Sequence, residues 1–341
     1  MNWNGYIDTI ECLESVYQIT YPNYDVVLVD NASEDGSIAQ VISYAEGKIA
    51  PESSFFAYSS QNKPIGFIQY TKKMAETGGS AAEDARLLLL PFNRRLRLIQ
   101  NDKNYGFAEA NNVAIRYALK ALNPDYFLLL NNDTVVDQRF LGELVAAVEC
   151  DATIGIAGPT IYYYDFEGKR DVIHFTGGRF DAWRGQPRII SSSETDARQY
   201  NRMREVDFVN GASLLARRSL VDQIGLLSTD YFLYWEENDW CIRAAKSGFK
   251  SVYVPRAKIW HKILRSITKT GGKGTYYAAR GRFYFMMKYG SNGQLLGFLT
   301  YFFFLQFWVN LGRYLRRRKL SYARMYVRGV LAGLFTRPPF I

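Results

Sequence analysis

The chain has 341 residues, of which 48% are hydrophobic and 22% charged, and its formal net charge is +9. This composition is typical of a globular protein and excludes disordered and fibrous chains. The three cysteines are far apart and match neither a zinc-binding spacing nor a small disulfide framework, so we expect a reduced, cytoplasmic setting.

The first residues, MNWNGY, read as the end of a strand and the start of a loop, with no strand before them. We therefore expect the first strand of the domain to be missing and residues 2 to 4 to be poorly anchored, which would place the start of this chain inside a longer reading frame. No basic segment followed by a long apolar stretch is present here, so a secretory signal is not predicted.

Short apolar runs then alternate with helical patterns. YDVVLVDN (24–31), RLRLIQN (95–101) and DYFLLLNN (125–132) predict strands, and helical stripes of apolar residues cover 107–122 and 138–150. A strand, helix, strand, helix order implies an α/β fold with a parallel sheet and right-handed crossovers.

Two further stretches complete the first domain. Residues 47–94 are long and mixed and contain ETGGSAAEDA, which reads as an exposed loop, so their structure is not predicted. After a possible short strand at 154–158, the pattern resumes with a strand in 205–218, a loop leading into a helix in 230–248, and a strand in 249–261. We assign residues 1–262 to one catalytic domain.

The remaining residues, 263–341, form a basic and aromatic region that we expect to be helical. From residue 240 to the end there is no Asp or Glu while Lys and Arg number 20, so the first 239 residues hold 22 basic against 33 acidic residues. The aromatic residues of this tail crowd into apolar runs, which favours a membrane surface over a nucleic-acid groove.

The run at 293–312 approaches the length of about 20 residues that spans a bilayer, and a second candidate helix covers 322–337. A single span would separate the basic cluster from the catalytic domain, so we favour helices that lie in the inner leaflet, at the cytoplasmic face. A helical hairpin buried against the domain or a partner subunit is the alternative.

Several polar side chains follow predicted strands, where open α/β sheets bind ligands. Asp133, beside Asn131 and Asn132, could hold a divalent cation, or it could cap the following helix. His261 ends the last strand and could add a nitrogen ligand, although a lone histidine is more often structural.

The stretch YWEENDW brings Glu236, Glu237 and Asp239 to the apparent start of a helix. Acidic residues there could simply suit the helix dipole. Mutual repulsion beside Trp235 and other apolar surface would raise their pKa values, however, as a general base requires. Asp239 could pair with Arg243 four residues later, which would leave Glu236 or Glu237 for chemistry.

The loops at 29–37 and 101–112 follow predicted strands. Gly106 opens a helix whose free backbone N–H groups could face phosphate. Neither loop contains a dinucleotide-binding glycine motif or a P-loop, which lowers the support for those functions.

Taken in order, the segments NWNGYIDTIECLESVYQITYPNYDVVLVDNASEDGS, NYGFAEANN, LLLNNDT, VNGASLLARRS, FLYWEENDWCIRAAKSGF and VPRAKIWH resemble family 2 glycosyltransferases of the rhamnosyltransferase-like branch. The resemblance covers most of residues 1 to 290. It implies a GT-A fold, with a mostly parallel Rossmann-like sheet flanked by helices, and an inverting transfer of a sugar from a nucleotide-diphosphate donor, a UDP-, dTDP- or GDP-sugar. The basic, aromatic tail itself predicts a C-terminal helical extension that associates with membranes, and it points to a glycan or polyprenyl-linked acceptor.

The resemblance also implies a role for each matching residue. The catalytic base falls on Glu237, with Glu236 beside it, and Mg²⁺ or Mn²⁺ on the diphosphate falls on Asp133 and His261. Acceptor contacts fall on Trp235 and Asp239. The residues implied to bind the nucleotide-sugar are Asn4, Asp30, Asn31, Asn104, Gly106, Asn132 and Gly211.

Two motifs depart from those of many relatives. NND has one carboxylate where two or three are common, and the pair is EE rather than ED, which lengthens the base by one methylene. A sugar nucleotidyltransferase and a non-catalytic, membrane-bound nucleotide-sugar-binding scaffold remain the alternatives. We expect an anionic membrane surface and no nucleic acid as partners, and the oligomeric state is not predicted.

Overall fold

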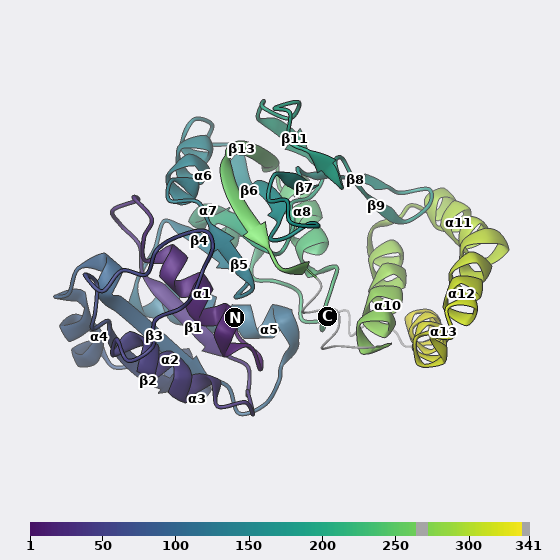
Figure 1. Cartoon of the computed structure of the whole chain (residues 1–341). Helices are drawn as coiled ribbons and strands as arrows, with labels where there is room; N and C mark the ends of the chain where they lie inside the picture. The colour runs from purple at the N-terminus through teal and green to yellow at the C-terminus, as the bar shows by residue number, and fades with distance from the viewer. Residues whose placement is uncertain (264–271, 336–341) are drawn as a thin grey trace.

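The structure is a computed structural model that describes residues 1–263 and 272–335 (Figure 1). It confirms a mixed α/β fold with a parallel sheet and helices after the last strand. The N-terminal lobe holds a three-stranded sheet, the central lobe holds an eight-stranded sheet, and the C-terminal helices stand at the far side of the molecule (Figure 1).

The three-stranded sheet is parallel, in the order β1 (Val26–Asp30), β3 (Arg95–Gln100), β2 (Gly66–Thr71). β1 and β3 are the strands predicted at 24–31 and 95–101. Apolar side chains of the sheet and its helices form the core of this lobe. The accompanying helices are α1 (Tyr6–Val16), α2 (Ser37–Ala45), α3 (Lys72–Glu76), α4 (Ala81–Leu88) and α5 (Gly106–Ala121).

The expectation that residues 2 to 4 are poorly anchored is wrong. Asn2 is buried and forms a parallel bridge with Asp30 at the edge of β1. Its backbone N–H donates to the carbonyl of Val29 at 2.8 Å, and its carbonyl accepts from the N–H of Asn31 at 2.8 Å. One residue therefore continues the sheet where a full strand would lie.

Residues 47–94 are ordered and extend this sheet. They supply β2 at its outer edge, α3, α4 and the short helix η1 (Phe92–Arg94). The exposed loop expected at ETGGSAAEDA is only partly correct, because Ser80 caps α4 by accepting a hydrogen bond from the N–H of Glu83 at 3.4 Å. Ser followed three residues later by Glu is a helix-start signature that was present in the sequence.

The central sheet mixes strand directions. β6 and β13 run parallel, while β12 pairs antiparallel with both β4 and β6. A continuation of the parallel sheet through 125–132 was expected and is not seen, because an apolar run indicates burial on two faces but not the direction of its neighbours. The strands are β4 (Tyr126–Leu130), β5 (Thr134–Val136), β6 (Ile154–Tyr163), β7 (Val172–Phe175), β10 (Glu194–Thr195), β11 (Arg204–Val206), β12 (Ser213–Arg217) and β13 (Lys250–His261).

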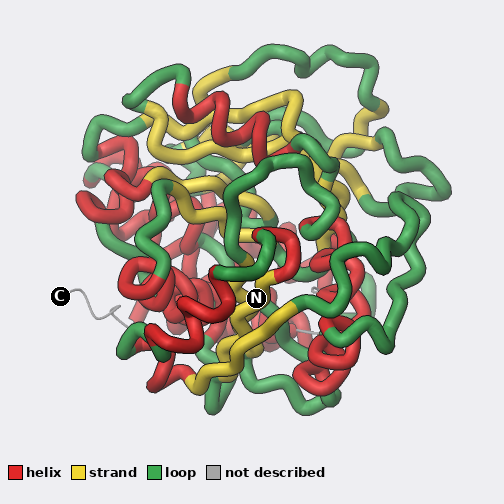
Figure 2. The backbone as a smooth tube through the Cα atoms, turned by 90° about the vertical axis from the view of Figure 1, so that its left-hand side faces the viewer, coloured by secondary structure: helices red, strands yellow, loops and turns green. Residues whose placement is uncertain are grey.

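Figure 2 turns the molecule by 90°, with the left-hand side of Figure 1 toward the viewer. The apolar side chains of the central sheet form the largest core cluster of the described residues. Three helices, α6 (Phe140–Glu149), α7 (Arg218–Ile224) and α8 (Glu236–Lys246), accompany it, and β8 (Gly178–Asp181) and β9 (Gln186–Ile189) form a separate hairpin.

The C-terminal region is helical, as predicted. It comprises α10 (Gly272–Tyr289), α11 (Asn292–Tyr301), the π-helical turn η2 (Phe302–Gln306), α12 (Phe307–Arg316) and α13 (Leu320–Phe335). The predicted second helix at 322–337 is α13 as far as 335, and its last two residues lie outside the described part of the chain.

Residues Asn292–Arg316 form one helical run of 25 residues that is long and apolar enough to cross a membrane, with a mean hydropathy of 1.5. Only 11% of its apolar window is buried within the protein. The alternative prediction, a helical hairpin buried against the catalytic domain, is therefore not seen for this run.

Candidate active site

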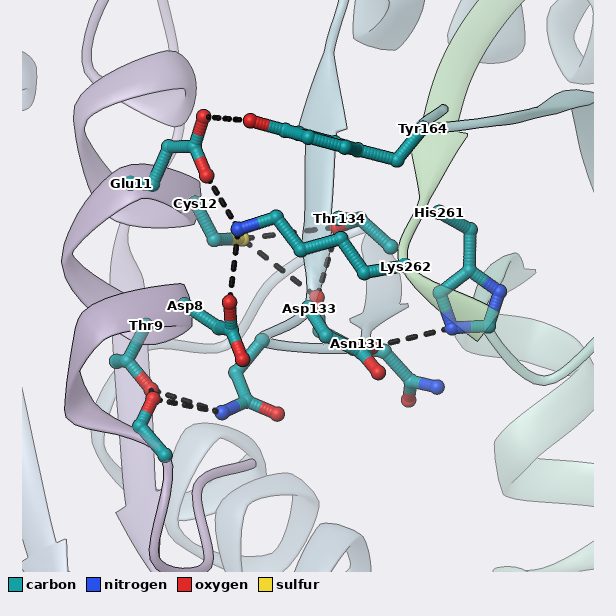
Figure 3. A network of polar contacts seen from close by, with 12 residues as sticks. Asp8, Thr9, Glu11, Cys12, Asn131, Asp133, Thr134, Tyr164, His261 and Lys262 are labelled. Carbon is teal, nitrogen blue, oxygen red and sulfur yellow. Dashed lines mark hydrogen bonds and ion pairs between the residues drawn. The ribbon is translucent and has the colours of Figure 1, made fainter. Parts of the chain in front are cut away.

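Asp133 and His261 meet at the edge of the central sheet (Figure 3). Asp133 immediately precedes β5, and His261, 128 residues later, pairs with Thr134 as the last residue of β13. The antiparallel pairing brings Asp133 Oδ1 to 3.1 Å from His261 Nε2. The structure thus joins the two residues that were predicted to share a metal.

Lys262 fixes this edge against helix α1, a contact that the sequence predictions missed. Its backbone N–H donates to the carbonyl of Asp133 at 2.9 Å, and its ammonium group donates to Asp8 Oδ1 at 2.7 Å and to Glu11 (Figure 3). Burial alone would lower the pKa of Lys262, but the hydrogen bonds and charges of the two carboxylates outweigh it and raise that pKa. Asp8 and Glu11 are three apart on one helix face, the only local signal of this contact.

Asn132 ties the same loop to the N-terminal segment. Its Nδ2 donates to Asn2 Oδ1 at 3.1 Å and to Thr9 Oγ1 at 2.8 Å. Asn2 Nδ2 in turn donates to Asp30 Oδ1 at 2.7 Å. Polar side chains therefore join the end of β1 in the three-stranded sheet to the end of β4 in the eight-stranded sheet.

Asp30 and Asn4 lie on either side of Ser33. The N–H of Ser33 donates to Asp30 Oδ2 at 2.9 Å and its hydroxyl donates to Asp30 Oδ1 at 2.6 Å. The N–H of Asn4 donates to Ser33 Oγ at 2.8 Å. Asn4 and Asp30, two of the residues predicted to bind the nucleotide-sugar, are thus held together by Ser33.

Asn31 holds the loop before α5. Its Nδ2 donates to Asn104 Oδ1 at 2.9 Å and to the carbonyl of Gly106 at 3.2 Å. The free N–H groups expected at this helix start are in part used internally, because the N–H of Gly106 donates to Asn104 Oδ1 at 2.9 Å and that of Phe107 to the carbonyl of Phe232 at 2.8 Å. Gly106 has φ of +80°, and a Cβ there would lie 2.3 Å from the Phe232 carbonyl oxygen, so only glycine fits.

Glu237, at the start of α8, lies beside Gly211, which comes two residues before the first residue of β12. A Cβ on Gly211 would lie 3.8 Å from the Cβ of Glu237, and the carbonyl of the next residue, Ala212, accepts from the N–H of Asn131 at 2.9 Å. Glu237 therefore lies next to Gly211, and the residue after Gly211 is hydrogen-bonded to Asn131, two residues before Asp133.

Burial raises the pKa of both glutamates at this helix start. The pKa of half-buried Glu237 rises to about 7. That of fully buried Glu236 rises well above its ordinary value, first through burial and then through the charge of Glu237. The direction agrees with the prediction from YWEENDW, and near neutral pH Glu237 loses its proton before Glu236 does.

Asp239 and Trp235 are used inside the protein. Asp239 is fully buried, and Asp239 Oδ2 accepts from Arg243 Nε at 2.7 Å, which confirms the predicted pair. The buried ring of Trp235 donates from Nε1 to the carbonyl of Ala278 in α10 at 2.9 Å. These positions support bracing of α8 more than the direct acceptor contact implied for both residues.

The backbone at this point is strained. Tyr234 and Trp235 have φ values of +69° and +81°, a region that residues with side chains rarely adopt. A Cβ on Gly281 of α10 would lie 2.5 Å from Trp235 Cδ1, so the indole packs closely on the helix backbone. Strained residues that the surroundings hold in place gather at functional sites.

The protein is similar to known proteins both in sequence and in fold. Residues 74–273 match the family model described as Glycosyltransferase like family 2. A hexosyltransferase of low-salt glycan biosynthesis, Agl10 from Haloferax volcanii, is 26% identical over 153 residues, which are 45% of this chain and 47% of that protein. An N-acetylglucosaminyl-diphospho-decaprenol L-rhamnosyltransferase from Mycobacterium tuberculosis is 29% identical over 180 residues, 49% of this chain and 58% of that one. The matches therefore span about half the length of these two relatives.

A mannosyltransferase from Pyrobaculum calidifontis, PcManGT, solved with GDP-Man and Mn²⁺, has a TM-score of 0.56 to this protein at 14% identity, covering 98% of this chain and 85% of that one. This likeness shows the shared fold and confirms the predicted GT-A type. Because the family model spans more than half of the chain, the protein belongs to Glycosyltransferase like family 2.

Proposed function

We propose that the protein is an inverting glycosyltransferase that moves a sugar from a UDP-, dTDP- or GDP-sugar to a hydroxyl group of a glycan or lipid-linked acceptor. The observation that carries the proposal is the placement of Glu237. Its carboxyl group lies at the start of α8 with a pKa of about 7, beside Gly211, and the next residue, Ala212, is hydrogen-bonded to Asn131 in the loop that ends in Asp133.

In this proposal Glu237 is the general base. As the acceptor hydroxyl attacks the anomeric carbon, the Glu237 carboxylate takes its proton, and the bond to the diphosphate breaks on the opposite face. A base with a pKa near the working pH is ionised in an appreciable fraction and still accepts a proton readily. Glu236 stays protonated beside it, so it adds no second negative charge.

Asp133 and His261 are the residues that would hold Mg²⁺ or Mn²⁺. The carboxylate oxygen of Asp133 suits both ions, and the imidazole nitrogen of His261, 3.1 Å from it, is a ligand typical of transition metals, which favours Mn²⁺. Residues 1–263 and 272–335 contain no group of three or more His, Cys, Asp and Glu that could hold an ion, so the diphosphate would supply further oxygens. A bound divalent ion offsets the negative charge that develops on the departing diphosphate.

The donor would lie along the joined strand ends. We assign its nucleotide to the loops of Asn4, Asp30 and Asn31 and to the turn of Asn104 and Gly106, with Asn132 and Gly211 nearer the sugar. Several of these side chains hold one another, so their contribution would be the shape of the loops and the backbone groups that these present.

The acceptor would come from a membrane. One relative is named for a decaprenol-linked substrate, and the helical run Asn292–Arg316 exposes most of its apolar surface. Five basic residues, Arg313 and residues 316–319, lie at its C-terminal end and would face anionic lipid at the cytoplasmic surface. Trp235 and Asp239 would support the acceptor side from beneath.

The test is incubation of the purified protein with Mg²⁺ or Mn²⁺ and a panel of UDP-, dTDP- and GDP-sugars, with release of nucleoside diphosphate as the readout. Glu237→Gln should abolish release while nucleotide binding survives, and Glu205→Gln, an exposed glutamate on β11, should leave both unchanged. Near-normal turnover by Glu237→Gln would refute the assignment of the base. Pyrophosphate release would indicate a nucleotidyltransferase, and tight binding without turnover would indicate a scaffold.

A further inference from the structure

A cavity of about 470 Å³ lies between α6, residues 196–201 and the middle of β13. Lys258 lines it, and Trp260 stacks on Tyr162, another lining residue, with ring centroids 5.9 Å apart. Because side chains alternate along a strand, His261 points to the other face of β13. The cavity is therefore separate from the candidate active site.

Positive charge surrounds this cavity. Arg139, Arg198, Arg256 and Lys258 line it, and none of them forms an ion pair within the described part of the chain. Asp196, one of two acidic lining residues, is already engaged, since its carboxylate accepts from the hydroxyl of Tyr162 at 2.5 Å and from the backbone N–H of Arg198 at 2.8 Å.

The positive charge of the cavity lining contrasts with the negative net charge of the first 239 residues. The first 239 residues, which supply two of the arginines, contain 33 acidic and 22 basic residues. Four basic side chains against the carboxylates of Glu143 and Asp196 leave the cavity lining with an excess of positive charge, which a bound anion would offset.

A bulge in β13 shapes the cavity wall. The pairing with β6 shifts between Val254 and Lys258, so that residues 255–257 have no partner on β6. Thr160 Oγ1 donates to the carbonyl of Pro255 at 3.1 Å and lies 2.8 Å from the hydroxyl of Tyr253, which holds the bulge in place. Bulges re-aim side chains, and this one brings Arg256 to the cavity.

We propose that the cavity is a second binding site, for a sugar-sized ligand that bears an oxyanion, either phosphate or carboxylate. Guanidinium groups match both oxyanions with paired hydrogen bonds. The volume falls in the range of about 300–1,000 Å³ that small-molecule sites occupy, larger than an inorganic ion needs. The exposed side chain of Asn201, another lining residue, supplies an amide group for the hydroxyls of such a ligand.

The test is calorimetric titration of the full chain with glucose 1-phosphate, glucuronate and neutral glucose. We expect saturable binding of an acidic sugar, and the better of the two acidic probes identifies the oxyanion. The double variant Arg198→Ala with Arg256→Ala should weaken this binding by at least about 10-fold, since each lost charge-assisted hydrogen bond costs about one factor of ten or more. Both arginines are exposed, so the variant should fold, which circular dichroism checks.

Two further variants separate this site from the active site and from general charge. Arg86→Ala removes an exposed arginine of α4 and should leave binding unchanged. Asp133→Ala with His261→Ala should also leave it unchanged. The proposal is overturned if the double arginine variant binds as the parent does, if binding is lost with Asp133 and His261 instead, if glucose binds equally well, or if no acidic probe binds saturably.

Discussion

Replacing Asp239 by Asn should destabilise the protein strongly, because its carboxylate joins α8 to α10. The side chain is fully buried and accepts from Arg243 Nε at 2.7 Å, from Lys288 Nζ at 2.8 Å and from the hydroxyl of Tyr289 at 2.7 Å. Asn has one acceptor oxygen for these three donors, and its amide nitrogen must face at least one of them.

The magnitude follows from these contacts. A hydrogen bond to a charged group contributes about 1.5–3 kcal/mol against about 1 kcal/mol for a neutral one, so three weakened bonds imply a loss of about 3 kcal/mol. Arg243 and Lys288 are partly exposed and regain some hydration, which keeps the loss below the upper end of the range of about 3–5 kcal/mol for a broken buried pair.

The assay is urea unfolding in detergent, with Asp222→Asn as the matched control. Asp222 pairs with Arg218 at 2.8 Å, also four residues apart on a helix, but it is 55% exposed, so its variant should lose about 0.5 kcal/mol or less. Transfer activity of Asp239→Asn should fall as well, because Glu237 lies only two residues away on α8. Equal stability changes in the two variants would refute the reasoning.

Three further predictions follow from the same structure. Transfer activity should rise with pH through about 7 as Glu237 loses its proton, and a flat rate profile from pH 5 to 8 would contradict this. The free energy of unfolding should fall between about pH 4.5 and about pH 7, because the folded state keeps that proton to a higher pH than the unfolded chain does. Gly106→Ala should weaken nucleotide binding and should lower stability more than Gly36→Ala does, because Gly36 has a similar φ of +77° but nothing within 4 Å of the added Cβ. Calorimetry and unfolding compare the two variants, and equal losses would count against a clash with the Phe232 carbonyl. Phe304→Glu, in the helical run Asn292–Arg316, should weaken flotation with anionic vesicles, because Phe304 is 84% exposed on its apolar surface. Leu89→Glu, at a residue 86% exposed in the catalytic domain, should not, and unchanged flotation of the Phe304 variant would argue against membrane binding through Asn292–Arg316.

A point variant tests the membrane prediction better than deletion of residues 291–341 does. α13 packs closely on α10, where a Cβ on Gly329 would lie 2.4 Å from the carbonyl oxygen of Tyr276. α10 in turn braces α8 through Trp235 and Asp239. Deletion would therefore disturb the catalytic helix as well as remove the apolar surface.

Local pattern determined much of this protein. The apolar runs at 24–31, 95–101 and 125–132 formed strands, as expected because a short run of consecutive β-branched and aliphatic residues is typical of a buried strand. The polar residues at their ends were expected to lie close together, and Asn2 joins two of them, Asp30 and Asn132. The pair of Asp239 and Arg243 followed from helical spacing alone.

Only the tertiary structure decided which distant residues meet. That β12 runs antiparallel beside β4, and that Lys262 reaches α1 across about 250 residues, depends on packing between elements with no local signature. Asp133 and His261 combine both levels. The sequence marked each as a polar residue at a strand end, and the pairing of β5 with β13 alone brought their side chains to 3.1 Å.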